Sequence, residues 1–209
     1  DLRETATNNI LSDQRVLNER RFKAIDDLWA GFLELKNKQA AASMLSTLNV
    51  SELAERIEDP KIQEFINVLT NPLNLENGNI YGEASQRASS ARPWITYDVW
   101  ILYFAYAMVI QYSVTVLVAL NNQMTEPKKF FDTVQFSKIL KDALPDMNVD
   151  WDNLSDATLP SLLELLEFRL LQKIEYTTSG KQSDEETYRR ASYMAERVEN
   201  TNQEASKAT

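Results

Sequence analysis

The sequence predicts an all-α protein, an irregular bundle of six or seven helices around a central apolar helix at about residues 96–123. Three observations support this prediction. The chain of 209 residues has only 4 glycines and 6 prolines, whereas a many-stranded fold needs many tight turns. Apolar residues recur at spacings of three and four along most segments. One uncharged run, WILYFAYAMVIQYSVTVLVAL at 100–120, is long enough to be either the centre of a bundle or a membrane span.

The N-terminal segment, residues 1–40, predicts one long protruding helix. It has no proline and a single glycine, and its first half is mostly polar. The second half carries an apolar stripe at helical spacing, formed by Ile25, Leu28, Trp29, Phe32 and Leu35. We expect the second half to pack on a core and the first half to project or meet a partner. The sustained heptads that a strict coiled coil requires are absent.

Two shorter helices and a loop are expected next. Asn49 followed by Glu52 predicts an N-cap pair that opens a helix through Glu58. The Asp-Pro pair at 59–60 predicts a second helix start. Residues 71–93 hold half of the glycines and two of the prolines. We therefore predict that this segment is the longest loop.

Helical patterns continue toward the C-terminus. Thr96 is in place to cap the central apolar helix. Amphipathic stretches follow at 130–144 and from Thr158 until Gly180 breaks the helix, and Ser183 with Glu186 predicts a capping box for a last helix. The expected domains are a long N-terminal helix at 1–40 with a polar first half, a helical bundle at 41–200 and a frayed tail at 201–209.

The central run has two interpretations, a buried core helix and a transmembrane span. Its aromatic residues lie inside the run, whereas spans concentrate Trp and Tyr at their two ends. The amphipathic helices elsewhere need an apolar surface to cover. We favour the buried helix and keep insertion of residues 99–120 in a bilayer as the alternative. Three tyrosine hydroxyls would then need partners, because an unpaired buried hydroxyl costs about 1–3 kcal/mol. These hydroxyls could reach the periphery of the helix itself or the backbone of the loop at 71–93.

Charge and composition exclude several classes of function. The protein is acidic, with a net charge of −9 and a pI of about 4.7, and its basic residues are interspersed with acidic ones. We therefore expect no nucleic-acid partner and disfavour an anionic membrane surface. Cys and His are both absent, which removes disulfides, zinc and haem sites built on them, and Ser-His-Asp or Cys-His catalysis.

The same absences predict a protein that is not an enzyme and holds no cofactor or metal. An enzyme that uses carboxylates or an unusual Ser/Lys pair stays open as an alternative. A chain without Cys fits a reducing compartment, so we expect a cytoplasmic location. The chain begins at Asp1 rather than Met, so we expect that an upstream segment exists or was removed.

Two acidic patterns could suggest chemistry. The loop after residue 145 places Asp146, Asn148 and Asp150 at positions 1, 3 and 5 of an EF-hand, but Trp151 stands at the glycine position and Ala157 at the glutamate position. A calcium site is therefore not expected. The carboxylates at 164 and 167 share the face opposite the leucines of their helix, and we expect that face to be solvated rather than catalytic.

The block ARPWITYDVWILYFAYAMV places arginine and large aromatic residues at the start of the central helix. Arg, Trp and Tyr are enriched at binding hot spots. The other interpretation, aromatic packing at the edge of the core, is favoured by how often such side chains are buried. The candidate partner-binding residues combine this block with the charged N-terminal helix and are Arg15, Arg20, Arg92, Trp94, Tyr97 and Trp100.

This block, together with RRFKAIDDLWAGFLELK upstream, resembles a scattered group of uncharacterised bacterial helical proteins. In those proteins a charged N-terminal helix leads into a Leu-Trp segment, and an Arg-Pro plus Trp…Phe-x-Ala-Tyr block follows. The resemblance covers about residues 15–175. It implies an all-helical bacterial protein, sometimes linked to an N-terminal membrane or coiled segment. It implies no activity and transfers no functional residue.

The sequence therefore predicts a non-enzymatic interaction or scaffold protein. We expect it to self-associate or to join a larger assembly through the N-terminal helix and the aromatic block, with another protein or a second copy as partner. The alternative is a membrane-associated subunit with residues 99–120 inserted in the bilayer.

Overall fold

A computed structural model describes residues 2–73 and 80–179 of the chain. The chain divides into two compact units, residues 1–170 and 171–209, and each is considered by itself. The expected capping box at Ser183 and Glu186 and the expected tail at 201–209 lie outside the described residues. The domain boundaries expected from the sequence stay predictions.

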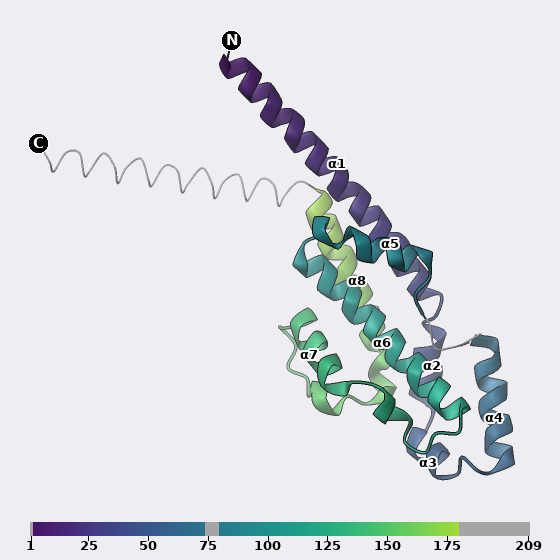
Figure 1. Cartoon of the computed structure of the whole chain (residues 1–209). Helices are drawn as coiled ribbons and strands as arrows, with labels where there is room; N and C mark the ends of the chain where they lie inside the picture. The colour runs from purple at the N-terminus through teal and green to yellow at the C-terminus, as the bar shows by residue number, and fades with distance from the viewer. Residues whose placement is uncertain (1, 74–79, 180–209) are drawn as a thin grey trace, which may run out of the picture. The chain divides into compact units, whose positions relative to one another are not determined.

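The described residues form helices and connecting segments, and no strand occurs among them (Figure 1). The fold is all-α, as predicted. The α-helices are α1 (Leu2–Lys36), α2 (Ala40–Thr47), α3 (Val50–Glu55), α4 (Pro60–Thr70), α5 (Glu83–Ala91), α6 (Tyr97–Asn121), α7 (Thr133–Ala143) and α8 (Leu159–Thr178). The short 3-10 helices are η1 (Asn71–Leu73), η3 (Arg92–Trp94), η4 (Pro127–Phe130), η5 (Trp151–Asn153) and η6 (Asp156–Thr158).

Helix α6 is the central apolar helix of the first unit, and this prediction is confirmed. Helices α1, α2, α4 and α7 pack against it (Figure 1). Among the described residues it is the one helix long and apolar enough to cross a membrane, and 72% of its most apolar stretch is buried inside the fold. Its apolar side chains point in all directions because neighbouring helices lie on several sides.

The buried tyrosines of α6 differ in how their hydroxyls are satisfied. The Tyr112 hydroxyl donates to Asp156 Oδ1 at 2.7 Å, and Lys128 Nζ lies 2.6 Å from the other oxygen of that carboxylate. These contacts join η4 and η6 to α6. The hydroxyls of Tyr103 and Tyr106 have no hydrogen-bond partner among the described residues. The backbone of residues 71–73 and 80–93 therefore supplies no hydrogen bond to these two hydroxyls, and for residues 74–79 the expectation stays a prediction.

The segment predicted as one long loop, residues 71–93, contains helix α5, so that prediction is wrong for residues 83–91. The buried face of α5 consists of small side chains, Ser85, Ala88 and Ala91, which give no large apolar stripe in the sequence. Helix α5 packs against α1, and Ala88 lies next to Gly31. A Cβ placed on Gly31 would lie only 2.9 Å from the Cβ of Ala88. The absence of a side chain at Gly31 thus allows the two helices to approach closely.

Helix α1 also caps the start of α5. One carboxylate oxygen of Glu34, Oε2, accepts hydrogen bonds from the Ser85 backbone N–H at 2.7 Å and from Ser85 Oγ at 3.0 Å. The N-cap residue itself, Gly82, has no side chain to do this. A Cβ on Gly82 would overlap the Glu34 carboxylate. The negative charge of Glu34 also interacts favourably with the helix dipole at the N-terminus of α5.

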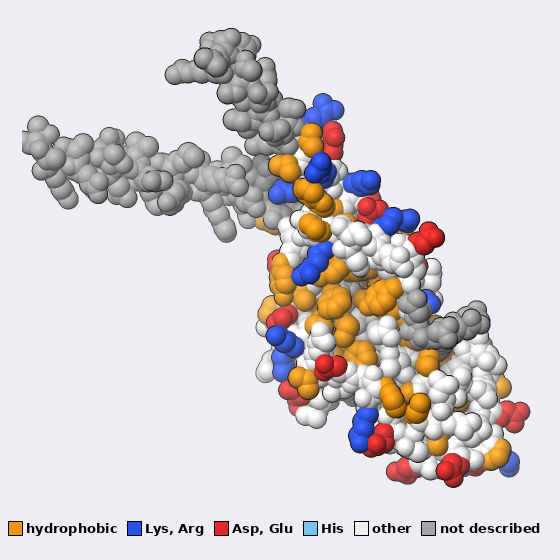
Figure 2. Space-filling model, viewed as in Figure 1, with side chains coloured by type: hydrophobic (Ala, Val, Ile, Leu, Met, Phe, Trp, Pro, Cys, Tyr) orange, Lys and Arg blue, Asp and Glu red, His pale blue; other side chains and the backbone are white. Residues whose placement is uncertain are grey.

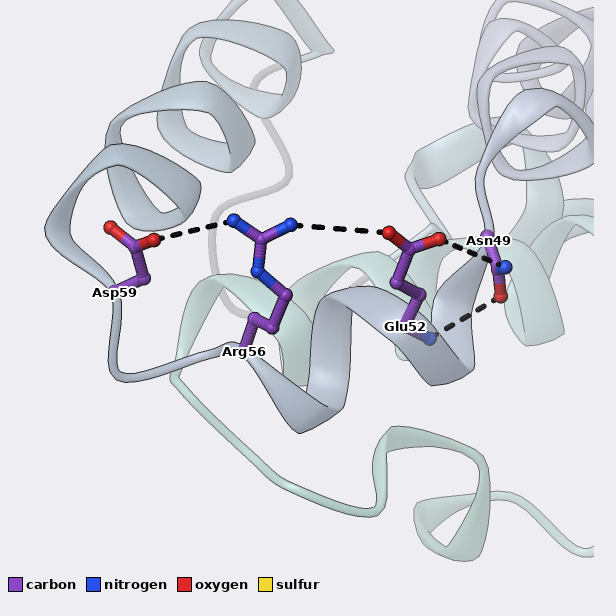
Figure 3. A network of polar contacts seen from close by, with 4 residues as sticks. All are labelled: Asn49, Glu52, Arg56 and Asp59. Carbon is purple, nitrogen blue, oxygen red and sulfur yellow. Dashed lines mark hydrogen bonds and ion pairs between the residues drawn. The ribbon is translucent and has the colours of Figure 1, made fainter.

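The predicted helix starts at 49 and 59 are confirmed (Figure 3). Asn49 Oδ1 accepts from the Glu52 backbone N–H at 3.3 Å, and Asp59 Oδ1 accepts from the Lys61 N–H at 3.0 Å. Arg56 lies between the two caps, 3.9 Å from the Glu52 carboxylate and 3.4 Å from that of Asp59. Helix α3 ends at Glu55, three residues before the predicted end.

The carboxylate pair on α8 does not share one environment. Glu164 is exposed, as predicted. Glu167 is partly buried and forms an ion pair with Lys36 of α1, so the expectation of a solvated face is wrong for this residue. This ion pair joins the end of α1 to α8 within the first unit.

Candidate interaction site

The first turns of α1 for which side chains are described are uncovered. Every residue from 15 to 23 is exposed, and the hydrophobic side chains Val16, Leu17 and Phe22 are 45%, 45% and 51% exposed. Burial begins at Ala24: Ala24, Ile25 and Leu28 are buried, whereas Asp26 between them is exposed. Figure 2 shows basic, acidic and hydrophobic side chains mixed along this part of α1. Along α1 the side chains therefore change from exposed at residues 15–23 to packed in the core within about one turn.

Helix α5 and the following turn η3 run antiparallel to α1. Glu34 lies against Ser85 near one end of the pair, and Arg20 lies over Trp94 at the other, with its guanidinium carbon 5.0 Å from the ring centroid. Trp94 is 38% exposed. An arginine over an indole face is a favourable cation–π contact, and it holds an aromatic side chain in place at the surface.

A groove of about 770 Å³ lies between the two helices. Its floor contains the buried alanines Ala24 and Ala91, and Trp94 forms one rim. The remaining lining is polar and comes from both helices, namely Arg20, Lys23 and Asp27 of α1 and Glu83, Gln86, Arg87 and Ser90 of α5. Arg87 Nε lies 3.9 Å from Asp27 Oδ1 across the groove.

Of the remaining predicted site residues, Arg92 and Trp100 contact each other, whereas Tyr97 and Arg15 lie apart. Arg92 lies over the Trp100 ring at 5.4 Å, and Trp100 stacks on Phe104 with centroids 6.2 Å apart. Tyr97 is exposed, and Arg15 forms an exposed ion pair with Glu19 on its own helix at 3.1 Å. The structure thus forms two arginine–tryptophan pairs from four of the six predicted residues, and it leaves Tyr97 and Arg15 outside them.

Sequence reasoning missed the contribution of α5 to the groove, from Glu83 to Ala91. The available signal was the run of small residues at 85, 88 and 91 together with Gly31, which marks close helix packing. Among the described residues no group of three acidic or other ligating side chains could hold a metal ion. Side chains of both charges beside an exposed aromatic ring suit recognition of a partner.

Comparison with protein families, curated proteins and solved structures finds no match to this chain.

Proposed function

We propose that the protein is a non-enzymatic interaction or scaffold module that self-associates or joins a larger assembly through the exposed part of α1. The observation that supports this proposal is the uncovered stretch from 15 to 23, in which three large hydrophobic side chains are about half exposed. Exposed apolar surface on a helix that otherwise packs in a core is typical of a binding site for another helix.

The geometry of α1 shows which face of the helix the exposed residues 15–23 share with the buried residues that follow. Leu17 precedes Ala24 by seven residues and Leu28 by eleven, so all three lie on one face of the helix. Ala24 and Leu28 are buried, and Leu17 is not. Near Leu17 the turn η3 ends at Trp94, whose ring lies under the guanidinium group of Arg20 on α1. An incoming helix at Leu17 would continue the packing that the rest of this face makes inside the chain.

The experiment compares association states by light scattering and sedimentation over a range of concentrations. We expect the wild-type chain to self-associate and Leu17→Glu to weaken this association, because a carboxylate would be buried at the contact. Val134→Glu is the matched control, since Val134 on α7 is 80% exposed. A wild-type chain that remains monomeric at every concentration would refute self-association through α1.

The second candidate is a membrane-associated subunit with residues 99–120 inserted. The length and the mean hydropathy of 1.8 over the most apolar stretch of α6 favour it. Such insertion would require the helices packed on α6 to separate from it. Monodisperse behaviour without detergent would exclude this function, whereas dependence on detergent would favour it.

A further inference from the structure

We propose that the groove between α1 and α5 binds an acidic helical segment of a partner protein, with the partner's carboxylates beside Arg20 and Lys23 and its apolar side chains on Trp94. This inference rests on the proposed function and names the chemistry of the partner. It does not depend on self-association, so the two can fail separately.

The charges of the groove favour an acidic ligand at one end. Asp27 faces Arg87 at 3.9 Å, so these two charges largely compensate each other. Lys23 makes no hydrogen bond or ion pair with the described residues. The Arg20 guanidinium contacts the Trp94 ring, and none of its N–H groups donates to a described residue. Two cations are therefore left for a ligand, on a chain whose net charge is −9.

The acidic lining residues lie toward the other end. Glu83 opens α5, whereas Trp94 ends the 3-10 turn that follows it, so the two are separated by about 18 Å at about 1.5 Å per residue in α5 and about 2.0 Å in η3. On α1, Lys23 precedes Asp27 by one turn. Apart from the Asp27–Arg87 pair, the charges that remain are thus Arg20 and Lys23 at the Trp94 end and Glu83 at the other end. A segment with its carboxylates gathered at one end matches this polarity, and like charges oppose the reversed orientation.

The shape of the groove suits a helix. Lining residues recur every three or four positions on both walls, so the groove runs along the two helix axes. The alanine floor at 24 and 91 leaves room for side chains that point down from above. The ring of Trp94, 38% exposed and held by Arg20, offers a preformed apolar contact that needs little ordering on binding.

The test uses a defined probe, a blocked alanine-rich helical peptide of about four turns with Glu at every third or fourth position in one half. Binding to the whole chain is measured by calorimetry and by tryptophan fluorescence at low and at physiological salt. Matched peptides carry Gln or Lys in place of Glu. We expect the Glu peptide to bind, the Gln peptide to bind at least about fivefold more weakly, and the Lys peptide to bind the groove more weakly still, because Arg20 and Lys23 attract carboxylates and repel ammonium groups.

Variants of the chain then locate the contact. Lys23→Glu should weaken binding of the Glu peptide at least about fivefold, since attraction becomes repulsion. Lys138→Glu, at an exposed position of α7, makes the same change in net charge and should leave binding almost unchanged. Trp94→Ala should also weaken binding. Circular dichroism of each variant confirms that it is folded.

Three results would overturn the proposal. Equal binding of the Glu and Gln peptides would remove the role of charge. Equal losses for the variants at 23 and 138 would show attraction to net charge rather than to the groove. A chain that binds no peptide but whose self-association is abolished by Lys23→Glu would assign the groove to a second copy, and the proposed association through α1 would still stand.

Discussion

The contact between α1 and α5 depends on Gly31, and Gly31→Ala measures how tight it is. Glycine inside a helix is usually unfavourable, so alanine should stabilise the helix itself by about 1 kcal/mol. Close contacts around Gly31 would offset that gain in stability. A Cβ at position 31 would lie 2.9 Å from the Ala88 Cβ, 3.0 Å from the Tyr103 hydroxyl and 3.1 Å from the Ala84 carbonyl oxygen.

These three contacts are shorter than ordinary carbon contacts, which are about 3.5–4.0 Å. Two of them involve the Cβ of Ala88 and the backbone of Ala84, which can move only if α5 moves. Overpacking of a well-packed interface costs about 1–3 kcal/mol. Set against the gain in helix propensity, the expected net effect of Gly31→Ala is a loss of about 1 kcal/mol in the free energy of unfolding. For a chain of this size that lowers the melting temperature by about 2–4 °C.

Urea denaturation and thermal melting of four proteins test this expectation: wild type, Gly31→Ala, Ala88→Gly and the double variant. Ala88→Gly alone should cost about 1 kcal/mol through helix propensity. In the double variant it removes the shortest contact, so the combined loss should be smaller than the sum by about 1 kcal/mol. A Gly31→Ala chain that gains the full propensity term, or strictly additive losses, would show that the helices are not in close contact at this point.

The buried side chains of α6 give four further expectations. Tyr106→Phe should stabilise the chain by about 1 kcal/mol in urea denaturation, because the buried Tyr106 hydroxyl has no partner among the described residues. A loss of stability of that size would instead show that this hydroxyl forms a hydrogen bond. Tyr112→Phe should instead destabilise it by about 1.5–3 kcal/mol, since the Tyr112 hydroxyl donates to the Asp156 carboxylate, and an unchanged midpoint would contradict this. Burial raises the pKa of Tyr103 from 10.0 to about 12. The contribution of this group to the free energy of unfolding is therefore complete below pH 10 and is lost as the pH rises through 12. Between those pH values the melting temperature of Tyr103→Phe should fall less than that of the wild type. Val109→Asp should prevent soluble expression, because Val109 is fully buried, and a soluble, cooperatively folded variant would argue against a central position for α6.

The sequence was a reliable guide where large apolar side chains or caps carry the signal. The stripe from Ile25 to Leu35 predicted the buried half of α1, and all of it except Trp29 is fully buried. Asn49 and Asp59 predicted two helix starts because each side chain accepts a backbone N–H at a helix end. The uncharged run in α6 predicted the central helix, since the amphipathic helices elsewhere in the chain need an apolar helix to pack against.

The sequence was a poor guide where packing depends on the absence of side chains. Helix α5 buries Ser85, Ala88 and Ala91, and its N-terminal cap comes from Glu34, far away in the chain. No local pattern reports a cap donated by another helix. The partner of Arg20 in the site could not be predicted either, because the contact with Trp94 exists only once α5 lies along α1.

The close packing of α1 on α5 and the groove beside it have the same physical origin. Small residues bring the two helix axes near each other at Gly31 and Ala88, so the larger polar side chains, such as Arg87, are displaced to the flank of the contact. Farther along, Ala24 and Ala91 are too short to fill the space between the helices, and the groove opens there. A sequence with large apolar residues at those alanines would have made α5 easy to predict, and it would have filled the surface on which we propose a partner binds.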